Sequence, residues 1–521
     1  MAAEFDAIVI GSGLGGLTAG ALYARAGRRV LVLERNEGFG GAATTYRHGP
    51  LTIEASLHET SDPSDPRDPK ARILRALGLR DRLDFVPVGA LYEVRGGLFD
   101  LPFVMPHGML SAEAALAERF PSHPEVFRRL FERIAAVREA VALVGEAHDT
   151  LWWFARAPQV PLKLWPLLRD MRQTLGEVFA EHFGHDEAPK LALAANLAYY
   201  GDDPSRLWWL YYAIAQGDLI ASGGTYLRGG SRSLTGSLVD VIAQEGGAAL
   251  AGRTVNAILL DDDGRAVGVR HVGAGGADPQ QALAPVLFGN AAPQVLGAAL
   301  PAMARERFLA PYAGRQLSIS LFSAAFGLDR DPAELGLTRY STMLLPDWMR
   351  RLDDFHGCGL LMAEPPGARM PPLAVVNYGA ADSGLNPGGP HLVAAVGIDR
   401  LANWEGLSDA TYAHRRDAWL DALVAALDRA APGFAAALVH RELSTALTMR
   451  HQLNTPEGAI YGFAPEAPAG LGRRGGESGV RTAIDGLWLA SAYGGFGGFT
   501  GAMLTGALAA RAALQAAPHA R

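Results

Sequence analysis

Three glycines near the start of the chain have the spacing of a phosphate-binding turn. They are Gly11, Gly13 and Gly16, in the pattern G-x-G-x-x-G. In this pattern the first glycine makes a tight turn, the second lets backbone approach a pyrophosphate, and the third lets a helix pack closely on a strand. Glu34 lies 18 residues after Gly16, close to the spacing expected for an acid that binds ribose hydroxyls. These residues predict an adenine dinucleotide site, and the carboxylate of Glu34 disfavours the 2′-phosphate of NADP.

The segments around these residues are those that the motif needs. A short apolar run at 7–10 predicts a buried strand, and the apolar segment 14–26 predicts a helix that ends at Gly27. A second strand is expected at 30–33, directly before Glu34. The N-terminus of the helix offers free N–H groups and a partial positive charge to phosphates. A glycine motif alone is a weak signal in a chain with 62 glycines, whereas the whole ordered unit is a strong one.

A second glycine pair follows the acid. Gly40 and Gly41 lie in the stretch GFGGAATTY, and an NAD-binding domain does not need such a turn. A longer dinucleotide needs it, because its ribityl phosphate passes close to the backbone. The chain here resembles the glutathione-reductase-type FAD family, and within it the phytoene desaturase, carotenoid isomerase and retinol saturase group. The segment 49–58, GPLTIEASLH, is similar to that group's next segment, with Glu54 and His58 at its usual acid and histidine.

This resemblance implies FAD-binding residues in three separated segments. The first is the N-terminal unit, the second is a helix–strand–turn–strand unit at 223–272, and the third is the end of the chain, which would close over the flavin. The implied FAD-binding residues are Gly11, Gly13, Leu14, Gly15, Gly16, Glu34, Arg35, Gly40, Gly41, Ala42, Val255, Ala492, Phe499 and Thr500. Val255 would meet the adenine through its backbone, and Ala492 stands where many related flavoproteins carry an acid.

Few side chains near these segments are suited to acid–base chemistry. His58 and Tyr461 are the candidate catalytic residues, and a structural histidine bonded to backbone is the alternative for His58. Glu54 would either bind the cofactor or cap a turn. The single cysteine, Cys358, excludes a redox dithiol within one chain, and a buried thiol is expected. No histidine, aspartate and glutamate have the sequence spacing of metal ligands, so no metal site is expected.

Composition bounds the class of protein. The chain has 521 residues, which is enough for two domains, and a net charge of −7 without a basic block argues against a nucleic-acid partner. The uncharged run 486–510 is long enough to cross a bilayer, but seven of its 25 residues are glycines. Glycines favour a strand at 487–490, a tight loop and a buried helix at 502–514 instead. No targeting peptide is expected, and the cytoplasm is the expected location.

The segment 149–216 is rich in aromatic residues and holds five of the nine tryptophans. An aromatic stripe at helical spacing most often belongs to a core. The alternative is that these helices line an apolar tunnel or lie on a membrane surface. The stretch 152–165, WWFARAPQVPLKLW, mixes bases, prolines and aromatics as interfacial segments do. A peripheral contact with the inner face of a membrane through this helical insert is therefore kept as an alternative.

The predicted fold class is α/β. It combines a Rossmann-type, glutathione-reductase-like FAD-binding domain with an α+β substrate domain and a helical insert. The predicted boundaries are 1–75, 221–300 and 455–521 for the FAD-binding domain, 76–220 for the helical insert, and 301–454 for the substrate-domain sheet and helices. Residues 330–390 are rich in proline and glycine and predict mostly irregular structure.

The resemblance implies an FAD-dependent oxidoreductase that acts on a C–C or C=C bond of a large apolar molecule, such as a carotenoid or another polyene or isoprenoid. Desaturation, saturation and flavin-assisted isomerisation need similar sites, so all three stay open. One alternative is an FAD-dependent amine oxidase, which would carry an aromatic cage and often a lysine near the flavin. Another is a non-catalytic prenyl- or lipid-binding protein of the Rab escort and dissociation-inhibitor type, which lacks an intact FAD site. The sequence does not indicate an oligomeric state.

Overall fold

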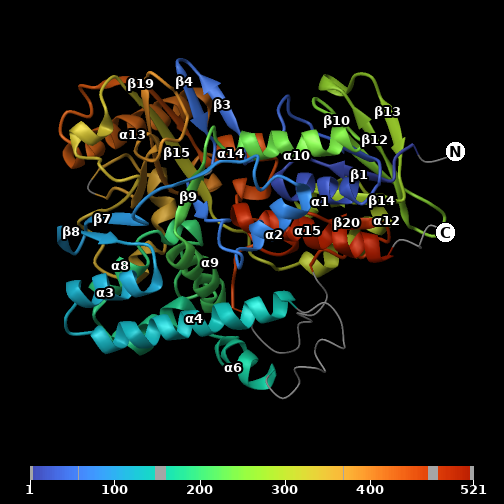
Figure 1. The fold of residues 1–521 in the computed structure, drawn as a ribbon. Helices are drawn as coiled ribbons and strands as arrows, with labels where there is room; N and C mark the ends of the chain where they lie inside the picture. Colours follow the sequence, from blue (N-terminus) through green and yellow to red (C-terminus); the bar gives the residue numbers. More distant parts are fainter. Residues whose placement is uncertain (1–3, 57, 147–159, 368, 468–478, 517–521) are drawn as a thin grey trace.

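Two sheets organise the chain, one on each side of the molecule (Figure 1). The computed structural model describes residues 4–56, 58–146, 160–367, 369–467 and 479–516. The first sheet has five parallel strands in the order β10-β2-β1-β14-β20, with the bounds Ala248–Leu250, Val30–Leu33, Ala7–Ile10, Val286–Gly289 and Leu487–Leu489. Strand β1 is central, because Ala7 pairs with both Val30 and Val286. The predicted Rossmann-type sheet is confirmed.

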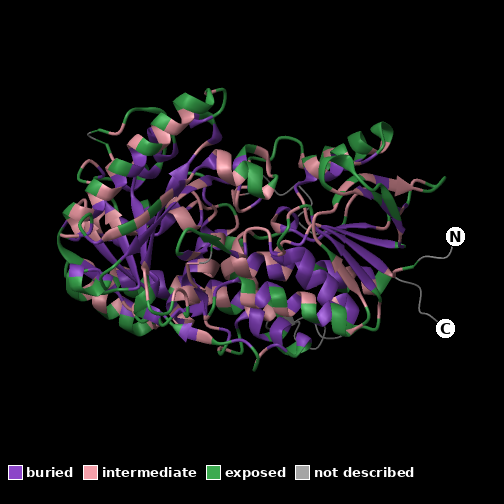
Figure 2. Cartoon of the chain, turned by 90° about the horizontal axis from the view of Figure 1, so that it is seen from above, coloured by how far each residue is buried: buried purple, intermediate pink, exposed green. Residues whose placement is uncertain are grey.

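Both faces of this sheet are covered, and β1, β2, β14 and β20 are buried throughout, whereas the edge strand β10 is partly exposed (Figure 2). Ala7 and Val9 face a helical layer, whereas Ile8 and Ile10 face an antiparallel sheet with two short helices. The helical layer contains α1 (Leu14–Arg25), α2 (Pro69–Leu77), α10 (Arg232–Gln244) and α15 (Gly498–Ala516). The opposite layer contains β11 (Thr254–Leu260), β12 (Ala266–Val272), β13 (Gln280–Leu283), α11 (Pro293–Ala298) and α12 (Ala302–Leu309).

The second sheet has seven strands in the order β19-β15-β18-β17-β16-β7-β8. Their bounds are Leu438–Ser444, Ser320–Leu328, His391–Asp399, Leu373–Asn377, Ser341–Leu345, Tyr92–Gly96 and Phe99–Met105. All neighbouring pairs are antiparallel except β16 with β7. Helix α13 (Asp409–Ala430) covers one face of this sheet, and the helical insert packs against the other.

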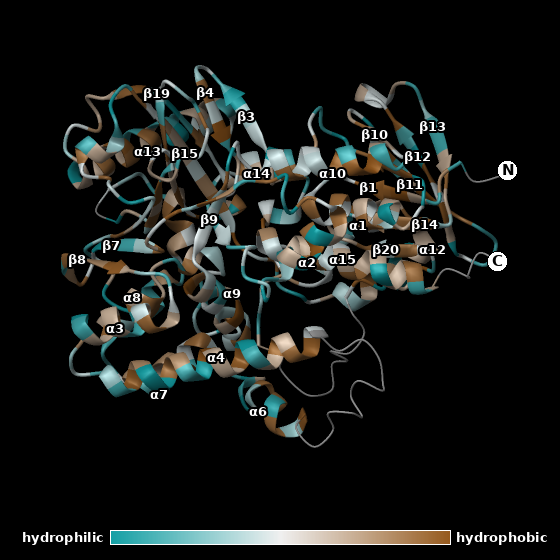
Figure 3. Ribbon diagram, viewed as in Figure 1, coloured by the Kyte–Doolittle hydropathy of each residue, from teal (hydrophilic) through white to brown (hydrophobic). Residues whose placement is uncertain are grey.

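The helical insert contains α3 (Met109–Arg119), α4 (Pro124–Glu146), α6 (Val160–Asp170), α7 (Leu175–Phe183), α8 (Glu187–Leu193) and α9 (Trp209–Ser222). Most of its described aromatic side chains belong to the core, as Trp209 and Tyr212 do, with ring centroids 5.9 Å apart. Helix α6 differs, because hydrophobic side chains on it are exposed (Figure 3). Residues 152–159 of the predicted interfacial stretch lie outside the described residues.

Two small sheets lie between the larger units. Strand β3 (Thr45–His48) pairs with β4 (Leu51–Glu54), and β9 (Gly224–Leu227) lies between β5 (Thr60–Ser61) and β6 (Phe85–Pro87). The helix expected from residue 223 therefore begins only at Arg232. Residues 330–390 are mostly irregular, as predicted, apart from short 3₁₀ turns and the strands β16 and β17. These two strands are short and flanked by proline and glycine. Their formation therefore depends on pairing with neighbouring strands rather than on the local sequence pattern.

The uncharged run 486–510 folds as β20, a glycine-rich turn and the first part of α15. Helix α15 packs on α1 at a glycine contact, where a Cβ on Gly506 would lie 2.1 Å from the carbonyl oxygen of Gly15. The helix starts at Gly498, earlier than the predicted 502. Within the part of the chain that the structure describes, no helix is both long and apolar enough to span a membrane.

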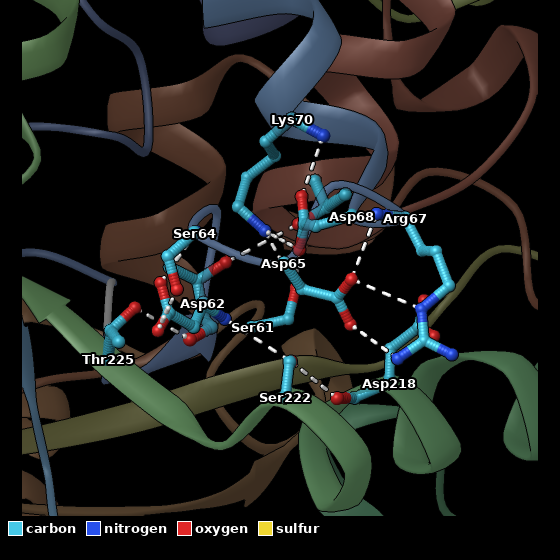
Figure 4. Close-up of polar contacts among 12 residues, drawn as sticks. Ser61, Asp62, Ser64, Asp65, Arg67, Asp68, Lys70, Asp218, Ser222 and Thr225 are labelled. Atoms are coloured by element: carbon cyan, nitrogen blue, oxygen red, sulfur yellow. Dashed lines mark hydrogen bonds and ion pairs between the residues drawn. The ribbon is translucent and has the colours of Figure 1, made fainter. Parts of the chain in front are cut away.

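A buried ion pair links α2 to the segment that precedes it (Figure 4). The ammonium group of Lys70 donates to Asp68 Oδ2 at 2.8 Å and to Ser61 Oγ at 2.7 Å, and both charged side chains are buried. Asp68 also caps α2 by accepting from the backbone N–H of Lys70. The backbone N–H of Asp62 lies 3.3 Å from Ser222 Oγ on α9. The network therefore holds β5 between the helical layer and the insert.

Candidate functional site

A cavity of about 2080 Å³ extends from the first sheet to the second. Its wall includes Gly11 and Glu34 on one side and Leu321, Ala374 and Val396 of the second sheet on the other. Pockets for small ligands typically measure about 300–1,000 Å³. The volume is therefore large enough for a dinucleotide together with a second ligand.

The cavity brings together residues from distant parts of the chain. Every predicted site residue except Gly16 lines it, namely Gly11, Gly13, Leu14, Gly15, Glu34, Arg35, Gly40, Gly41, Ala42, His58, Val255, Tyr461, Ala492, Phe499 and Thr500. Gly16 lies behind the wall, where a Cβ would stand 2.6 Å from Asn290 Cβ and 2.8 Å from the carbonyl oxygen of Gly11. It has the packing position that the motif assigns to its third glycine.

The carboxylate of Glu34 is buried at the end of β2 and holds the glycine turn. Its Oε2 accepts from the backbone N–H of Ser12 at 2.8 Å and from Ser12 Oγ at 2.6 Å. Its Oε1 accepts from the N–H of Asn36 at 2.8 Å. A carboxylate offers about four acceptor positions, so capacity remains for ribose hydroxyls at the cavity wall.

The second glycine pair rests directly on the first glycine turn. Gly40 has φ +119°, and a Cβ there would lie 2.4 Å from the carbonyl oxygen of Ala43. Gly41 has φ +59°, and its Cβ would lie 3.2 Å from Gly13 Cα. The two turns form a cradle of bare backbone that any side chain would fill. This cradle, the α1 N-terminus and the acid fit a cofactor with a pyrophosphate.

Two residues at this end of the sheet have roles that sequence reasoning did not assign. Asn290, directly after β14, donates through Nδ2 to the carbonyl oxygen of Ala490 at 2.5 Å, and so joins the ends of two strands. The sequence signal that could have identified Asn290 is its position, as a polar residue at the carboxyl end of a parallel strand. Arg35 is exposed and donates to the backbone carbonyls of His451 and Gln452, so it also tethers α14 (Ala446–Leu453) to the first sheet.

The two candidate catalytic residues are neutral groups. Burial lowers the pKa of His58 to about 4, so its imidazole is uncharged near neutral pH. Its backbone carbonyl accepts from the Tyr340 hydroxyl. Burial raises the pKa of Tyr461 well above its usual range, and the backbone N–H of Tyr461 donates to Ser318 Oγ at 2.9 Å. Both side chains can therefore orient a ligand, but neither carries a charge into the cavity.

Glu54 does not line the cavity. Its carboxylate accepts from the backbone N–H of Ser231 at 2.8 Å, from Ser231 Oγ at 2.6 Å and from the Tyr226 hydroxyl at 3.1 Å. It therefore holds the start of α10, which corresponds to the capping alternative. Cys358 is buried as predicted, with its thiol 3.0 Å from the carbonyl oxygen of Asp354.

Glu59 is a cavity residue that the sequence did not single out. Both of its carboxyl oxygens are buried and have no hydrogen-bond partner among the described residues. Two neighbouring hydroxyls are engaged elsewhere, since Tyr92 donates to the backbone of Ala192 and Tyr340 to that of His58. Burial raises the pKa of Glu59 to about 8. The structure thus places a neutral carboxylic acid beside His58.

The structure also gathers a group of metal-ligand type, although the sequence indicated none. His48, His440 and Glu442 each offer a ligand atom, and the three atoms lie within 4.8 Å of one another. The sequence spacing could not show this group, because His48 and His440 belong to different sheets and lie 392 residues apart. Glu442 also lines the edge of the cavity.

Comparison with known sequences relates the N-terminal unit to a known domain and the chain to known proteins. A family model described as an NAD(P)-binding Rossmann-like domain matches residues 9–68. All-trans-retinol 13,14-reductase of Macaca fascicularis is 28% identical over 51% of this chain, and the chain spans only 44% of that protein's length. The Danio rerio protein of the same name is 23% identical over 97% of this chain and 85% of its own. Prolycopene isomerase of Daucus carota is 23% identical over 93% and 76%.

Comparison with solved structures shows the fold. An oxidoreductase from Methanosarcina mazei has a TM-score of 0.61 at 16% identity, and cyclohexylamine oxidase from Brevibacterium oxydans has 0.59 at 15%, each covering 98% of this chain and 99% of its own. Fold and site together define a Rossmann-type dinucleotide-binding protein with a flavin or nucleotide cofactor. Retinol 13,14-reductases and prolycopene isomerases are its homologues, which confirms the predicted resemblance to that group.

Glu59 leads to a prediction about stability and pH. Its pKa of about 8 in the folded chain lies above the ordinary value of 4.5, so the folded state holds an extra proton between these values. The stability that the neutral group contributes is complete at low pH and is lost as the pH rises through 8. The free energy of unfolding of Glu59→Gln, relative to that of the natural chain, should therefore rise between about pH 5 and pH 9. Each unit of pKa difference corresponds to about 1.4 kcal/mol.

The measurement is urea unfolding across this pH range, followed by tryptophan fluorescence. Glu118→Gln on α3 is the matched control, because that residue is exposed. The same pH dependence in the natural chain and in Glu59→Gln would show that Glu59 titrates normally and finds a partner in solution.

Proposed function

We propose that this chain is an FAD-dependent oxidoreductase that acts on a C–C or C=C bond of a long apolar molecule, such as a polyene or isoprenoid. The observation that carries the proposal is the continuity of one cavity from the glycine cradle to the second sheet. A cofactor in the cradle and a substrate against the second sheet would meet in the same space. The homologues, named for retinol 13,14-reduction and prolycopene isomerisation, support this substrate class.

The residues that would hold FAD follow the cavity wall. Gly11, Gly13 and the N-terminus of α1 would hold the pyrophosphate, and Glu34 the ribose. The remaining predicted contacts, at the second glycine pair, the adenine and the flavin end, are Gly40, Gly41, Ala42, Val255, Ala492, Phe499 and Thr500. The chemistry that FAD supplies when bound is the acceptance or donation of hydride.

The substrate side of the cavity is built to exclude water. Its described wall carries aromatic and aliphatic side chains, including Tyr199, Tyr200, Tyr211, Ile214, Leu321 and Tyr461. An apolar chain gains free energy when it leaves water for such a surface, about 25 cal/mol per Å² buried. His58 and Tyr461 would orient the substrate as neutral groups. Thr60 Oγ1 lies 3.3 Å from Thr500 Oγ1, so the segment that carries His58 touches the start of α15.

The amine oxidase alternative receives less support from this cavity. A lysine near the flavin is expected in many amine oxidases, and none is found among the described residues that line the cavity. The likeness to cyclohexylamine oxidase rests on 15% identity and shows the fold alone.

The cofactor proposal predicts a yellow protein. The chain stripped of cofactor should regain one equivalent of FAD, measured by quenching of flavin fluorescence, and should bind FMN and NAD more weakly. Gly13→Ala should lower the affinity for FAD at least tenfold, because the added Cβ would lie 2.3 Å from Asn290 Oδ1. Gly236→Ala, whose Cβ meets nothing within 4 Å, is the control that should leave the affinity unchanged. A colourless protein that takes up no FAD would favour the non-catalytic lipid-binding alternative.

The reaction proposal is tested with a substrate panel. The FAD-loaded chain is incubated with polyenes, isoprenoids and amines, once in air as the electron acceptor and once with dithionite as the reductant, and products are identified by mass spectrometry and absorbance. We expect saturation, desaturation or isomerisation of a polyene or isoprenoid, with amines unchanged. His58→Ala should lower turnover without loss of FAD, because His58 lines the cavity outside the glycine cradle. Oxidation of amines alone would overturn the substrate class while leaving the cofactor proposal intact.

A peripheral membrane contact through α6 is part of this proposal. Leu162, Trp165 and Leu168 on this helix are 79%, 58% and 57% exposed, next to exposed Lys163 and Arg169. Apolar and basic side chains together are typical of helices that lie in a membrane interface.

Sedimentation with anionic phospholipid vesicles tests this contact. The triple replacement of Leu162, Trp165 and Leu168 by glutamine should reduce the bound fraction several-fold. Leu110→Gln, at an equally exposed site on α3, should not. Equal sedimentation of both variants would remove α6 from the contact.

A further inference from the structure

Three metal-ligand side chains converge where the β3–β4 hairpin meets β19. His48 ends β3, and His440 and Glu442 lie two residues apart on β19, so both point to the same face of that strand. His48 Nδ1 lies 3.0 Å from His440 Nε2 and 2.5 Å from Glu442 Oε2. None of these three residues has a part in the proposed oxidoreductase chemistry.

The surroundings orient this group. The Tyr46 hydroxyl donates to Glu442 Oε1, which leaves Oε2 for the centre of the group. The hairpin turn at Gly49 has φ +55°, and a Cβ there would lie 2.8 Å from the His440 ring. A glycine at this turn therefore gives the imidazole of His440 its space. Partners that fix the direction of a ligand are typical of the outer shell of metal sites.

A hydrogen bond from His48 Nδ1 to Glu442 Oε2, charge-assisted if the imidazole is protonated, satisfies one of these contacts and leaves the one with His440 Nε2 unsatisfied. A ring nitrogen of neutral imidazole carries either one proton or one lone pair. If His48 Nδ1 carries a proton, that N–H points at only one of its two close neighbours. If it carries none, its lone pair faces a carboxylate oxygen at 2.5 Å, which is repulsive. One cation at the centre would satisfy the lone pairs of both imidazoles and of the carboxylate together.

We propose that His48, His440 and Glu442 form a binding site for a divalent transition metal of the zinc type. Two imidazoles and one carboxylate are a common ligand set for such ions. Ligands about 2.0–2.2 Å from a tetrahedral zinc lie about 3.3 Å from one another. An outward movement of His48 by less than about 1 Å would bring its own two distances, 3.0 and 2.5 Å, to that value. Its side chain is 54% exposed and has room for this movement.

The metal would join the hairpin to the second sheet at the edge of the cavity. Tyr46 and Glu442 both line that edge, and the hairpin follows directly after the second glycine pair. The metal would therefore fix the β3–β4 hairpin at the edge of the cofactor cavity, with a fourth coordination position left to water. This role is structural and is independent of the reaction proposed for the cavity.

The test uses the full chain without a histidine tag, treated with EDTA and then dialysed. Zinc is titrated by calorimetry, and cobalt is followed by its visible absorption, which reports tetrahedral coordination. We expect one equivalent of each ion to bind and the thermal midpoint to rise with zinc. His440→Ala and His48→Ala should each weaken binding at least tenfold, whereas His414→Ala, an exposed histidine on α13, should not.

Glu442→Gln keeps the size of the side chain and removes its charge, so it tests the site if a histidine variant fails to fold. It should weaken zinc binding while the chain keeps its far-ultraviolet circular dichroism. The absence of zinc and cobalt binding in the natural chain would overturn the proposal, as would binding that these substitutions leave unchanged. FAD content measured in parallel separates failure of this site from failure of the cofactor proposal.

Discussion

Close contact of backbone with backbone at the carboxyl end of the central strand is the constraint on which this structure depends. Gly13 and Gly41 lie in contact there, and a side chain at Gly13 would collide with Asn290. Gly15 and Gly506 impose the same condition one layer further out, where α15 crosses α1. The N-terminal unit and the last helix of the chain can meet only because no side chain lies between them.

That meeting decides where the rest of the chain lies. Once α15 is seated on α1, Phe499 and Thr500 stand at the cavity beside the glycine turns. The buried pair of Lys70 and Asp68 then ties the helical layer to β5. A pair of this kind contributes little net stability, but loss of one partner leaves a buried charge without compensation, which costs about 3–5 kcal/mol. Its value lies in holding the layers in one arrangement.

The polar groups around the cavity fall into two kinds. Those at the glycine cradle are held by hydrogen bonds within the chain, as the carboxylate of Glu34 is by Ser12 and Asn36, with acceptor capacity left for a ligand. Those towards the second sheet are neutral and sparsely bonded, as Glu59 and His58 are. A polar end held by hydrogen bonds suits a charged cofactor, and an apolar end with neutral groups suits an apolar substrate. The two sheets keep these ends apart.

Local sequence alone was sufficient for β1, β2 and their glycine cradle, whereas β10 was not predicted. The strand, the glycines, the helix and Glu34 lie within 34 residues, so their spacing reports their geometry directly, and the far-off Val255 and Thr500 followed from the resemblance to a family. Only the tertiary structure decided the rest. The strands β16 and β17, the capping role of Glu54, the buried acid at Glu59 and the group of His48, His440 and Glu442 all depend on contacts between distant segments. A strand pair or a set of metal ligands forms only when folding brings distant residues together. The spacing of those residues along the chain does not predict such contacts.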